Sequence, residues 1–395
     1  MNQRTRPFWI VAFIVWITMV GANVPSPLYA VYAQRWHFGP ALLSGIFAIY
    51  VLFLVPSLLV WGQWSDMRGR RFAVAVGLAW GGVGCVLFLL AHSPLTLLAA
   101  RAAQGLAVGT LSGTATAMLT ELAPVRRLGA LAAGLTTAGG TAMGPLLAGV
   151  LAQYAPLPLR LSYGVELAAL AVAAVGLALV PETRARQSGP FRWRAPQVPR
   201  WMRAIFWRSG WSALVGWSIT ALFMALVPSY VGNLLHVANL AVAGGVVFLM
   251  LGTASVAQLS LKGIAPRPSM RWGLVLLIIG LGLLLAAVPA RSLALALAST
   301  LMAGWGQGMT FLGSMSEVTQ STPAPVRGGV VSGFYVVIYA GVGLSVLGVG
   351  ALAQHVGLYD AIFLFTALMT LFALGLLLWL RQELSVPDAA PGGSG

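Results

Sequence analysis

The chain has 395 residues, of which 59% are hydrophobic and only 8% are charged, and its mean hydropathy is +0.88. A soluble globular domain rarely carries so few charges, whereas a chain that crosses a lipid bilayer many times requires this balance. The net charge of +15 comes without the basic and aromatic pattern of nucleic-acid recognition, so no nucleic-acid partner is expected. The composition predicts a multi-pass membrane protein embedded in the lipid bilayer.

Apolar stretches long enough to cross the hydrocarbon, which takes about 20 residues in a helix, recur along the whole chain. They lie at 8–30, 41–63, 72–91, 95–120, 129–153, 161–180, 209–230, 241–261, 272–290, 293–318, 329–354 and 361–380. None shows the two-residue alternation of a β-barrel, and lipid tolerates only backbone whose polar groups are all bonded. The fold class expected is therefore an all-α membrane protein with twelve transmembrane helices.

The basic residues are distributed unevenly between the two sides of this topology. Nineteen lie on the side of the termini, only Arg35, Arg160 and Arg291 lie on the other, and Arg101 lies within a span. Because cytoplasmic loops carry the excess of Lys and Arg, both termini are expected in the cytoplasm. The expected location is the inner (cytoplasmic) membrane of a bacterium.

Two prolines interrupt the first span, in the run Asn23-Val24-Pro25-Ser26-Pro27-Leu28-Tyr29, and Tyr32 follows. Prolines free backbone carbonyls and bend a helix, so the nearby side chains can offer hydrogen bonds beside the kink. We expect Asn23, Tyr29 and Tyr32 to contact a ligand; a plain hinge is the alternative.

A charged turn, Gly62-Gln63-Trp64-Ser65-Asp66-Met67-Arg68-Gly69-Arg70-Arg71, separates spans 2 and 3. It must lie in water while both of its flanks lie in lipid. Gly69 permits a tight, left-handed turn, and Asp66 can cap a helix and pair with Arg70 or Arg71. The matching loop of the second half, from Lys262 to Arg267, contains no acid. We therefore expect the acid–base pairing of this turn in the first half only.

Arg101 is the only basic residue inside a span. At mid-helix a guanidinium costs about 2.5–3.5 kcal/mol on insertion scales, so it must face a cavity or a partner. Gln104 and Ser112 lie on the same narrow arc of the helix, which predicts a polar stripe along a central cavity. A structural salt bridge is the alternative.

Acids within or near the spans are few. Glu121 ends span 4, where a structural pair with Arg126 or Arg127 is expected. Glu166 lies at a depth in span 6 that matches Arg101, so the two could pair. Glu317 lies about one turn from the cytoplasmic end of span 10. Glu166 and Glu317 are the two candidates to carry a proton.

Aromatic residues in spans 10 and 11 offer a second kind of ligand contact. Trp305, Tyr335 and Tyr339 could form a platform for a flat or cationic ligand, with simple helix packing as the alternative. The single cysteine and four scattered histidines lack the spacing of a metal site. No nucleophile–base pattern or phosphate loop is present, so we expect no enzyme, cofactor or metal.

The chain divides into two related halves. Residues 181–208 form the only long polar break, and at a shift of 201 residues ten of 31 positions from Ala123 to Gln153 are identical in the second half. The predicted organisation is a six-helix bundle at 1–180, a basic cytoplasmic linker at 181–208, a second six-helix bundle at 209–381 and a flexible tail at 382–395. Six spans per half make the repeats parallel.

These features together resemble the major facilitator superfamily, over roughly residues 8–381. The resemblance rests on the turn from Gly62 to Arg71, on Arg101-Ala102-Ala103-Gln104-Gly105 in span 4, and on the span-5 segment. That segment, Gly140-Thr141-Ala142-Met143-Gly144-Pro145-Leu146-Leu147-Ala148-Gly149, is similar to the motif of twelve-span drug/proton antiporters.

The resemblance implies roles for these residues. The turn residues Gly62, Asp66, Gly69, Arg70 and Arg71 would switch conformation by clasping the bundles, and Gly140, Gly144, Pro145 and Gly149 would serve the same switch. Arg101, with Gln104, would couple protons or bind an anionic group.

The expected function is alternating-access, proton-coupled export of a small amphipathic compound or drug by a monomer, whose partners are that substrate and the proton gradient. Uptake of a sugar or carboxylate is the alternative, and a membrane enzyme or receptor a remote one.

Overall fold

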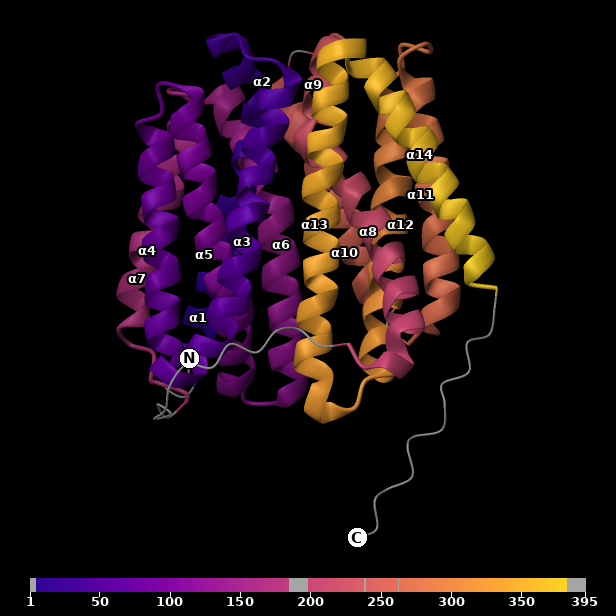
Figure 1. The fold of residues 1–395 in the computed structure, drawn as a ribbon. Helices are drawn as coiled ribbons and strands as arrows, with labels where there is room; N and C mark the ends of the chain where they lie inside the picture. The colour runs from indigo at the N-terminus through magenta and orange to yellow at the C-terminus, as the bar shows by residue number, and fades with distance from the viewer. Residues whose placement is uncertain (1–4, 185–197, 238, 262, 382–395) are drawn as a thin grey trace.

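The computed structural model describes residues 5–184, 198–237, 239–261 and 263–381, which form helices and no strands (Figure 1). The helices are α1 (Arg6–Asn23), α2 (Pro25–Trp36), α3 (Pro40–Arg68), α4 (Arg70–Leu89), α5 (Pro94–Leu122), α6 (Arg126–Tyr154), α7 (Leu161–Leu177), η1 (Arg200–Met202), α8 (Arg203–Ala225), α9 (Val227–Asn233), α10 (Leu240–Ser260), α11 (Pro266–Ala287), α12 (Leu293–Gln320), α13 (Ala324–Val356) and α14 (Leu358–Trp379). Residues 185–197 of the predicted linker at 181–208, and the predicted tail at 382–395, lie outside the described residues.

Within this part of the chain the α-helices form twelve rods, because α1 continues into α2 and α8 into α9. Both interruptions follow from proline, which removes a backbone N–H: Pro25 begins α2, and Pro228 lies at the start of α9. At a shift of 201 residues Pro27 falls on Pro228 and Tyr29 on Tyr230, so the interruption itself is repeated. The prediction of an all-α protein with twelve membrane-crossing elements is confirmed.

Eight of the described helices are apolar and long enough to cross a membrane by their own composition. The helices α5, α8 and α12 do not reach that hydropathy because they carry many Gly, Ser and Thr residues, and most of these are buried. Helices with such faces lie inside a membrane protein, where small and polar residues allow close packing and interhelical hydrogen bonds. Figure 1 shows α5, α8 and α12 among the other helices of their bundles.

The helices α1 to α7 lie on one side of the molecule and α8 to α14 on the other (Figure 1). The two sides meet mainly where α3 packs on α13 and α6 packs on α10. In the second half α10 corresponds to α3 of the first half, and α13 corresponds to α6. The contact of α3 with α13 and the contact of α6 with α10 are therefore equivalent. A two-fold arrangement of similar bundles produces this pairing.

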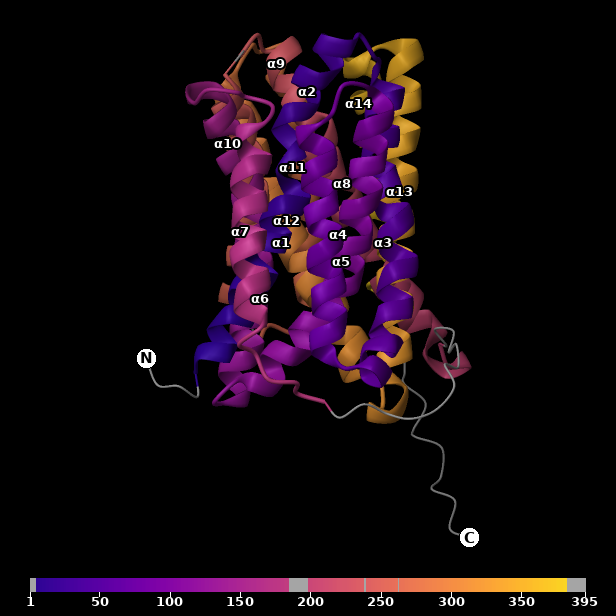
Figure 2. The ribbon, with the colours of Figure 1, turned by 90° about the vertical axis from the view of Figure 1, so that its left-hand side faces the viewer.

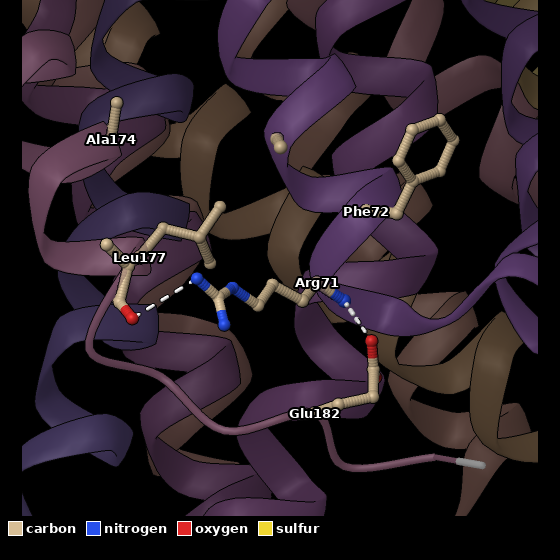
Figure 3. Close-up of a pocket in the computed structure, with 7 residues that line it drawn as sticks. Arg71, Phe72, Ala174, Leu177 and Glu182 are labelled. Carbon is tan, nitrogen blue, oxygen red and sulfur yellow. Dashed lines mark hydrogen bonds between the residues drawn. The ribbon is translucent and has the colours of Figure 1, made fainter. Parts of the chain in front are cut away.

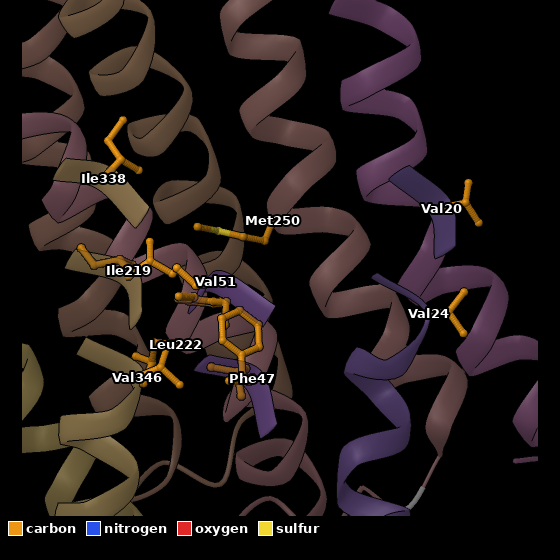
Figure 4. Packing of buried hydrophobic residues seen from close by; sticks show 14 of the residues in the cluster. Val20, Val24, Phe47, Val51, Ile219, Leu222, Met250, Ile338 and Val346 are labelled. Carbon is orange, nitrogen blue, oxygen red and sulfur yellow. The ribbon is translucent and has the colours of Figure 1, made fainter. Parts of the chain in front are cut away.

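Both contacts are close because they use small residues. Gly350 of α13 lies against Ser44 and the Pro40 carbonyl, and Gly244 of α10 lies against Pro145 and Gly149 of α6. Figure 4 shows apolar side chains of α3, including Phe47 and Val51, beside side chains of the second bundle.

We call the end at which α1 begins and α14 stops the linker end, and the other end the far end (Figures 1 and 2). The contact between α3 and α13 involves residues 39–51 and 343–354. The contact between α6 and α10 involves residues 142–154 and 239–251. All of these segments lie in the part of the bundle toward the far end. The two bundles are therefore held together at the far end.

Candidate functional site

The interruption of α1 is held by two polar side chains of α5. Pro25 lacks the N–H that would bond the Gly21 carbonyl, and Gln104 supplies a replacement, donating from Nε2 to that oxygen at 2.9 Å. Arg101 donates from Nη1 to the neighbouring Ala22 carbonyl at 2.8 Å. The polar stripe predicted on span 4 thus faces the kink predicted in span 1.

Arg101 is buried, with 2% of its surface exposed, and it pairs with no acid among the described residues. Its Nη1 also donates to Gln104 Oε1 at 2.8 Å, its guanidinium carbon lies 4.2 Å from the ring centre of Tyr50, and its Nε has no partner. The salt bridge considered for Arg101 is absent, and so is its pairing with Glu166. The physical reason is that Gln104 and the last turn of α1 lie between the two charged groups.

Glu166 comes from α7 and is 4% exposed. Its carboxyl group lies against Gly21 of α1, its Oε2 has no hydrogen-bond partner, and the Cys85 thiol of α4 lies within hydrogen-bonding reach. A void of about 10 Å³ separates it from Gln104. Glu166 therefore lies at the same interruption as Arg101, on the opposite side of α1.

The polar residues of the first span differ in how they are bonded. Asn23 donates to the Met19 carbonyl at 2.8 Å within its own helix. The Tyr32 hydroxyl lies 3.5 Å from the Tyr163 hydroxyl, and its ring stacks on Trp36 at 5.2 Å. Only Tyr29 keeps a buried hydroxyl that bonds to nothing in the described chain, so it is the member of this group with a hydrogen bond to offer.

The predicted aromatic platform forms only in part. Tyr335 and Tyr339 stack with their ring centres 6.2 Å apart, but Trp305 joins neither ring, which corrects the prediction. Trp305 lies on α12, which packs mainly on α11, α10 and α8, whereas α13 also reaches across to α3. The aromatic residue that sequence reasoning missed is Tyr50 of α3.

Tyr50 and Tyr339 pack on the same small cluster of buried apolar residues. Tyr50 belongs to the first bundle and Tyr339 to the second, so this cluster connects the surroundings of Arg101 to the stacked tyrosines. Only the position of Tyr50 in the middle of an apolar span could have pointed to it, and that signal is weak.

The charged turn contains the left-handed residue that its sequence predicts, because Gly69 has a φ of 98°. The first N–H groups of α4 are bound by Glu182, whose Oε1 accepts from Arg70 at 2.8 Å. Its Oε2 accepts from Arg71 at 3.2 Å, and Figure 3 shows the bond between these two residues. The Asp66 side chain lies outside the described ones, and Gly62 is exposed with open space around it. The carboxylate that caps α4 was therefore missed by the sequence analysis, which did not consider Glu182.

Arg71 also donates to the Ala178 carbonyl at 3.2 Å, across a pocket of about 500 Å³ between α4 and α7 (Figure 3). The Arg70 guanidinium is bound to Ser65 at 2.9 Å and to Glu121 at 3.5 Å. The described partners of Glu121 are thus Arg70 and the Thr183 hydroxyl, whereas the side chains of Arg126 and Arg127 lie outside the described ones. None of these partners belongs to the second bundle.

The second bundle has its own charged cluster at the linker end. Glu317 accepts hydrogen bonds from Arg208 and from Ser209, the latter at 2.6 Å, and lies 3.3 Å from Arg267 Nε. The expectation of acid–base pairing in the first half only was wrong, because the missing acid comes from α12 and not from the loop. Glu317, a candidate proton carrier, is engaged in ion pairs.

The span-5 motif lies between two other helices. Gly140 and Gly144 face the carbonyls of Trp16 and Val20 on α1, and Gly149 faces the Leu240 carbonyl on α10. Pro145 lies opposite Gly244 of α10. The motif therefore joins the interrupted first span to the second bundle.

Comparison with known proteins agrees with this architecture. The sequence model of the Major Facilitator Superfamily matches residues 11–267, which is more than half of the chain. The multidrug resistance protein MdtG of Proteus mirabilis is 29% identical over 164 residues, covering 38% of this chain and 39% of that protein. The cephamycin export protein CmcT of Amycolatopsis lactamdurans is 36% identical over 120 residues, covering 30% and 25%. The chain thus aligns with less than half the length of these curated relatives.

Among solved structures, a bacterial homologue of the human lysosomal transporter Spinster, described as inward-facing and unoccupied, superposes with a TM-score of 0.79. The match covers 96% of this chain and 98% of that one at 15% identity, so it concerns the fold. The chain belongs to the Major Facilitator Superfamily and is a transporter rather than an enzyme.

Proposed function

We propose that this transporter exports a small amphipathic compound in exchange for protons across the inner membrane of a bacterium, with both termini in the cytoplasm. The observation that carries the proposal is the pair Arg101 and Gln104, which holds the interrupted first span beside an acid, Glu166, that no cation among the described residues neutralises. A buried acid and a buried base that are close but unpaired suit a site whose charge changes during a cycle.

Export of an amphipathic compound is supported by the span-5 motif and by the relatives named for multidrug resistance and for cephamycin export. In this proposal the substrate contacts Tyr29 and Arg101 of the first bundle, with Tyr50, and Tyr335 and Tyr339 of the second. Aromatic rings give a broad apolar contact that tolerates different ligands, and the hydroxyl of Tyr29 adds a hydrogen bond. Four other residues that the sequence suggested as ligand contacts do not touch the substrate in this proposal: Asn23, Tyr32, Gln104 and Trp305.

The mechanism we propose is alternating access. The bundles meet at the far end, which the positive-inside rule assigns to the periplasm, so this arrangement is the inward-facing one. The likeness to a structure described as inward-facing supports that assignment. Opening the far end requires α3 to separate from α13 and α6 from α10, and the contact of Gly149 of α6 with Leu240 and Gly244 of α10 is one that must open.

One observation favours a second candidate, the uptake of an anionic solute. Arg101 is buried without a carboxylate partner, and its Nε makes no hydrogen bond in the described chain. A substrate carboxylate would neutralise this charge through bidentate hydrogen bonds. The direction of transport and the charge of the substrate distinguish uptake of an anionic solute from export of an amphipathic compound.

The test is transport in proteoliposomes with an imposed pH gradient, using panels of fluorescent amphipathic compounds and radiolabelled carboxylates. Export predicts movement of the amphipathic compounds that a protonophore abolishes, and Arg101→Ala should remove it. The matched control is Arg35→Ala, which replaces an exposed arginine at the far end. This variant should transport normally. Parental rates with unchanged pH dependence in Arg101→Ala would show that the site is assigned wrongly.

A further inference from the structure

The acid of α7 is in direct contact with the backbone of the interrupted span. A β-carbon on Gly21 would overlap the Glu166 carboxyl group, so this glycine leaves the space that the end of the Glu166 side chain occupies. Gly21 is also the residue whose carbonyl Gln104 binds. One residue of α1 therefore contacts the acid on one side and the amide that supports the interruption on the other.

The groups that face Glu166 come from every neighbouring element. They are Thr18 and Gly21 of α1, Cys85 of α4, Gln104 of α5 and Tyr163 of α7 itself. Within the described residues none of these is a cation, and Arg101 is reached only through Gln104. A buried carboxylate without a cation carries a large desolvation penalty, so the protein must supply hydrogen-bond donors or a proton.

The void between Gln104 and Glu166 has the volume of about one water molecule. It measures about 10 Å³ and is lined by Thr18, Gln104 and Glu166 among otherwise apolar side chains. A buried water needs about 10–15 Å³ and two to four polar partners, and this site offers both. Glu166 Oε2, which has no partner in the described protein, gives such a water a hydrogen bond to make.

We propose that Glu166 is a proton-binding site that controls the interruption of α1 through this single water and the amide of Gln104. The inference rests on the proposed proton-coupled function and specifies where the proton acts. When Glu166 carries the proton, its carboxyl group is neutral, and Gln104 and Arg101 remain on the carbonyls of Gly21 and Ala22. When the O–H bond breaks, the proton passes to this water as a hydronium ion and from it to bulk water, and the carboxylate left behind attracts the donors of Gln104 and Arg101.

Losing these donors frees both carbonyls and loosens the junction of α1 with α2. That junction is connected to the second bundle, because Ser26 of α2 donates a hydrogen bond to the Met224 carbonyl of α8. A change of charge on α7 thus reaches a contact between the bundles without the acid touching the substrate. Glu166 acts as a positioning residue, and Gly21 and Gln104 transmit its state.

The first test is direct detection of the proton. Infrared spectra of the purified protein, titrated with pH, should show a protonated carboxyl band that is lost in Glu166→Gln and shifted in frequency in Gln104→Leu. Asp360→Asn, an exposed acid at the start of α14, is the matched control and should keep the band. A band that persists unchanged in Glu166→Gln would overturn the proposal.

The second test measures conformation. Spin labels at Leu131 of α6 and Val326 of α13, both exposed near the linker end, report the separation of the bundles, and Cys85 is left in place because it is fully buried. We expect the distance distribution to change with pH in the parental protein and not in Glu166→Gln. Persistent pH dependence in Glu166→Gln would contradict the link between this acid and α1.

The third test separates this inference from the function on which it rests. Glu166→Gln should lose about 5- to 150-fold of the effect of the proton gradient on transport, the usual range of coupling between two sites. If the parental protein itself ignores the gradient, the proposed function fails, while the infrared and spin-label results still decide the role of Glu166. If the parental protein responds and Glu166→Gln responds equally, the inference alone fails.

Discussion

At the scale of single residues, buried arginine side chains are stabilised in two ways. Arg208 is fully buried and pairs with Glu317, whereas Arg101 is bound by a carbonyl, an amide and an aromatic face. An arginine held by an acid inside one bundle is part of the scaffold. An arginine held by neutral groups keeps most of its attraction for an added negative charge, which is why the site is assigned to Arg101.

This difference predicts a stability effect at Glu317. Glu317→Gln leaves Arg208 buried without a counter-charge, which should destabilise the protein by about 3–5 kcal/mol. Thermal unfolding in detergent measures the loss. Arg267→Ala is the control, because its side chain is 32% exposed and such pairs contribute about 0–1 kcal/mol. If the Glu317→Gln protein were as stable as the parent and had lost proton coupling, Glu317 would instead be the proton carrier.

At the scale of elements, α6 shows why glycine spacing matters. Gly140 and Gly144 lie one turn apart and face backbone carbonyls of α1 that cannot move aside, whereas Gly139 has only an ordinary contact with Trp16. The glycines of the motif thus set the distance between the fifth and first spans. The same close approach recurs at Gly149 and Gly244, where α6 meets α10.

Neighbouring glycines therefore differ in their tolerance of a methyl group. Gly140→Ala should cost about 1–3 kcal/mol, because overpacking pushes α6 away from α1. Gly139→Ala, one position along the same helix, should be close to neutral. Thermal unfolding and the yield of monodisperse protein in detergent compare the two variants, and equal behaviour would contradict the packing described for α6.

At the scale of the whole molecule, the two far-end contacts define the state of the transporter. A β-carbon built on Gly343 of α13 would lie 3.9 Å from that of Val51 of α3. This separation is within the usual range for a disulfide. Cysteines at these positions therefore join the bundles without distortion.

We expect Val51→Cys with Gly343→Cys, in a Cys85→Ser background, to stop transport when oxidised and to recover when reduced. The alternating-access proposal requires this contact to open in every cycle. The same double variant kept reduced is the control, since it carries both substitutions without the covalent bond between α3 and α13. Undiminished transport by the oxidised Val51 and Gly343 pair would refute the proposed cycle.

Much of the architecture is determined by the sequence alone. Lipid demands long apolar helices with all backbone groups bonded, so the apolar stretches together with the polar turns between them predict the twelve rods. Gly69 and the prolines after Asn23 act locally, which is why the left-handed turn and the interrupted span follow from the residues themselves. The shift of 201 residues indicates two similar halves.

Only the tertiary structure decides which distant residues meet. Glu182 caps α4 across 112 positions, Glu317 reaches Arg208 across 109, and Tyr50 lies under the Arg101 guanidinium. Nothing in the local pattern of these residues specifies such partners, because a buried polar group binds whichever complementary group the packing brings to it. The separation of Arg101 from Glu166 by Gln104 has the same origin: equal depth in two spans does not determine which helix lies between them.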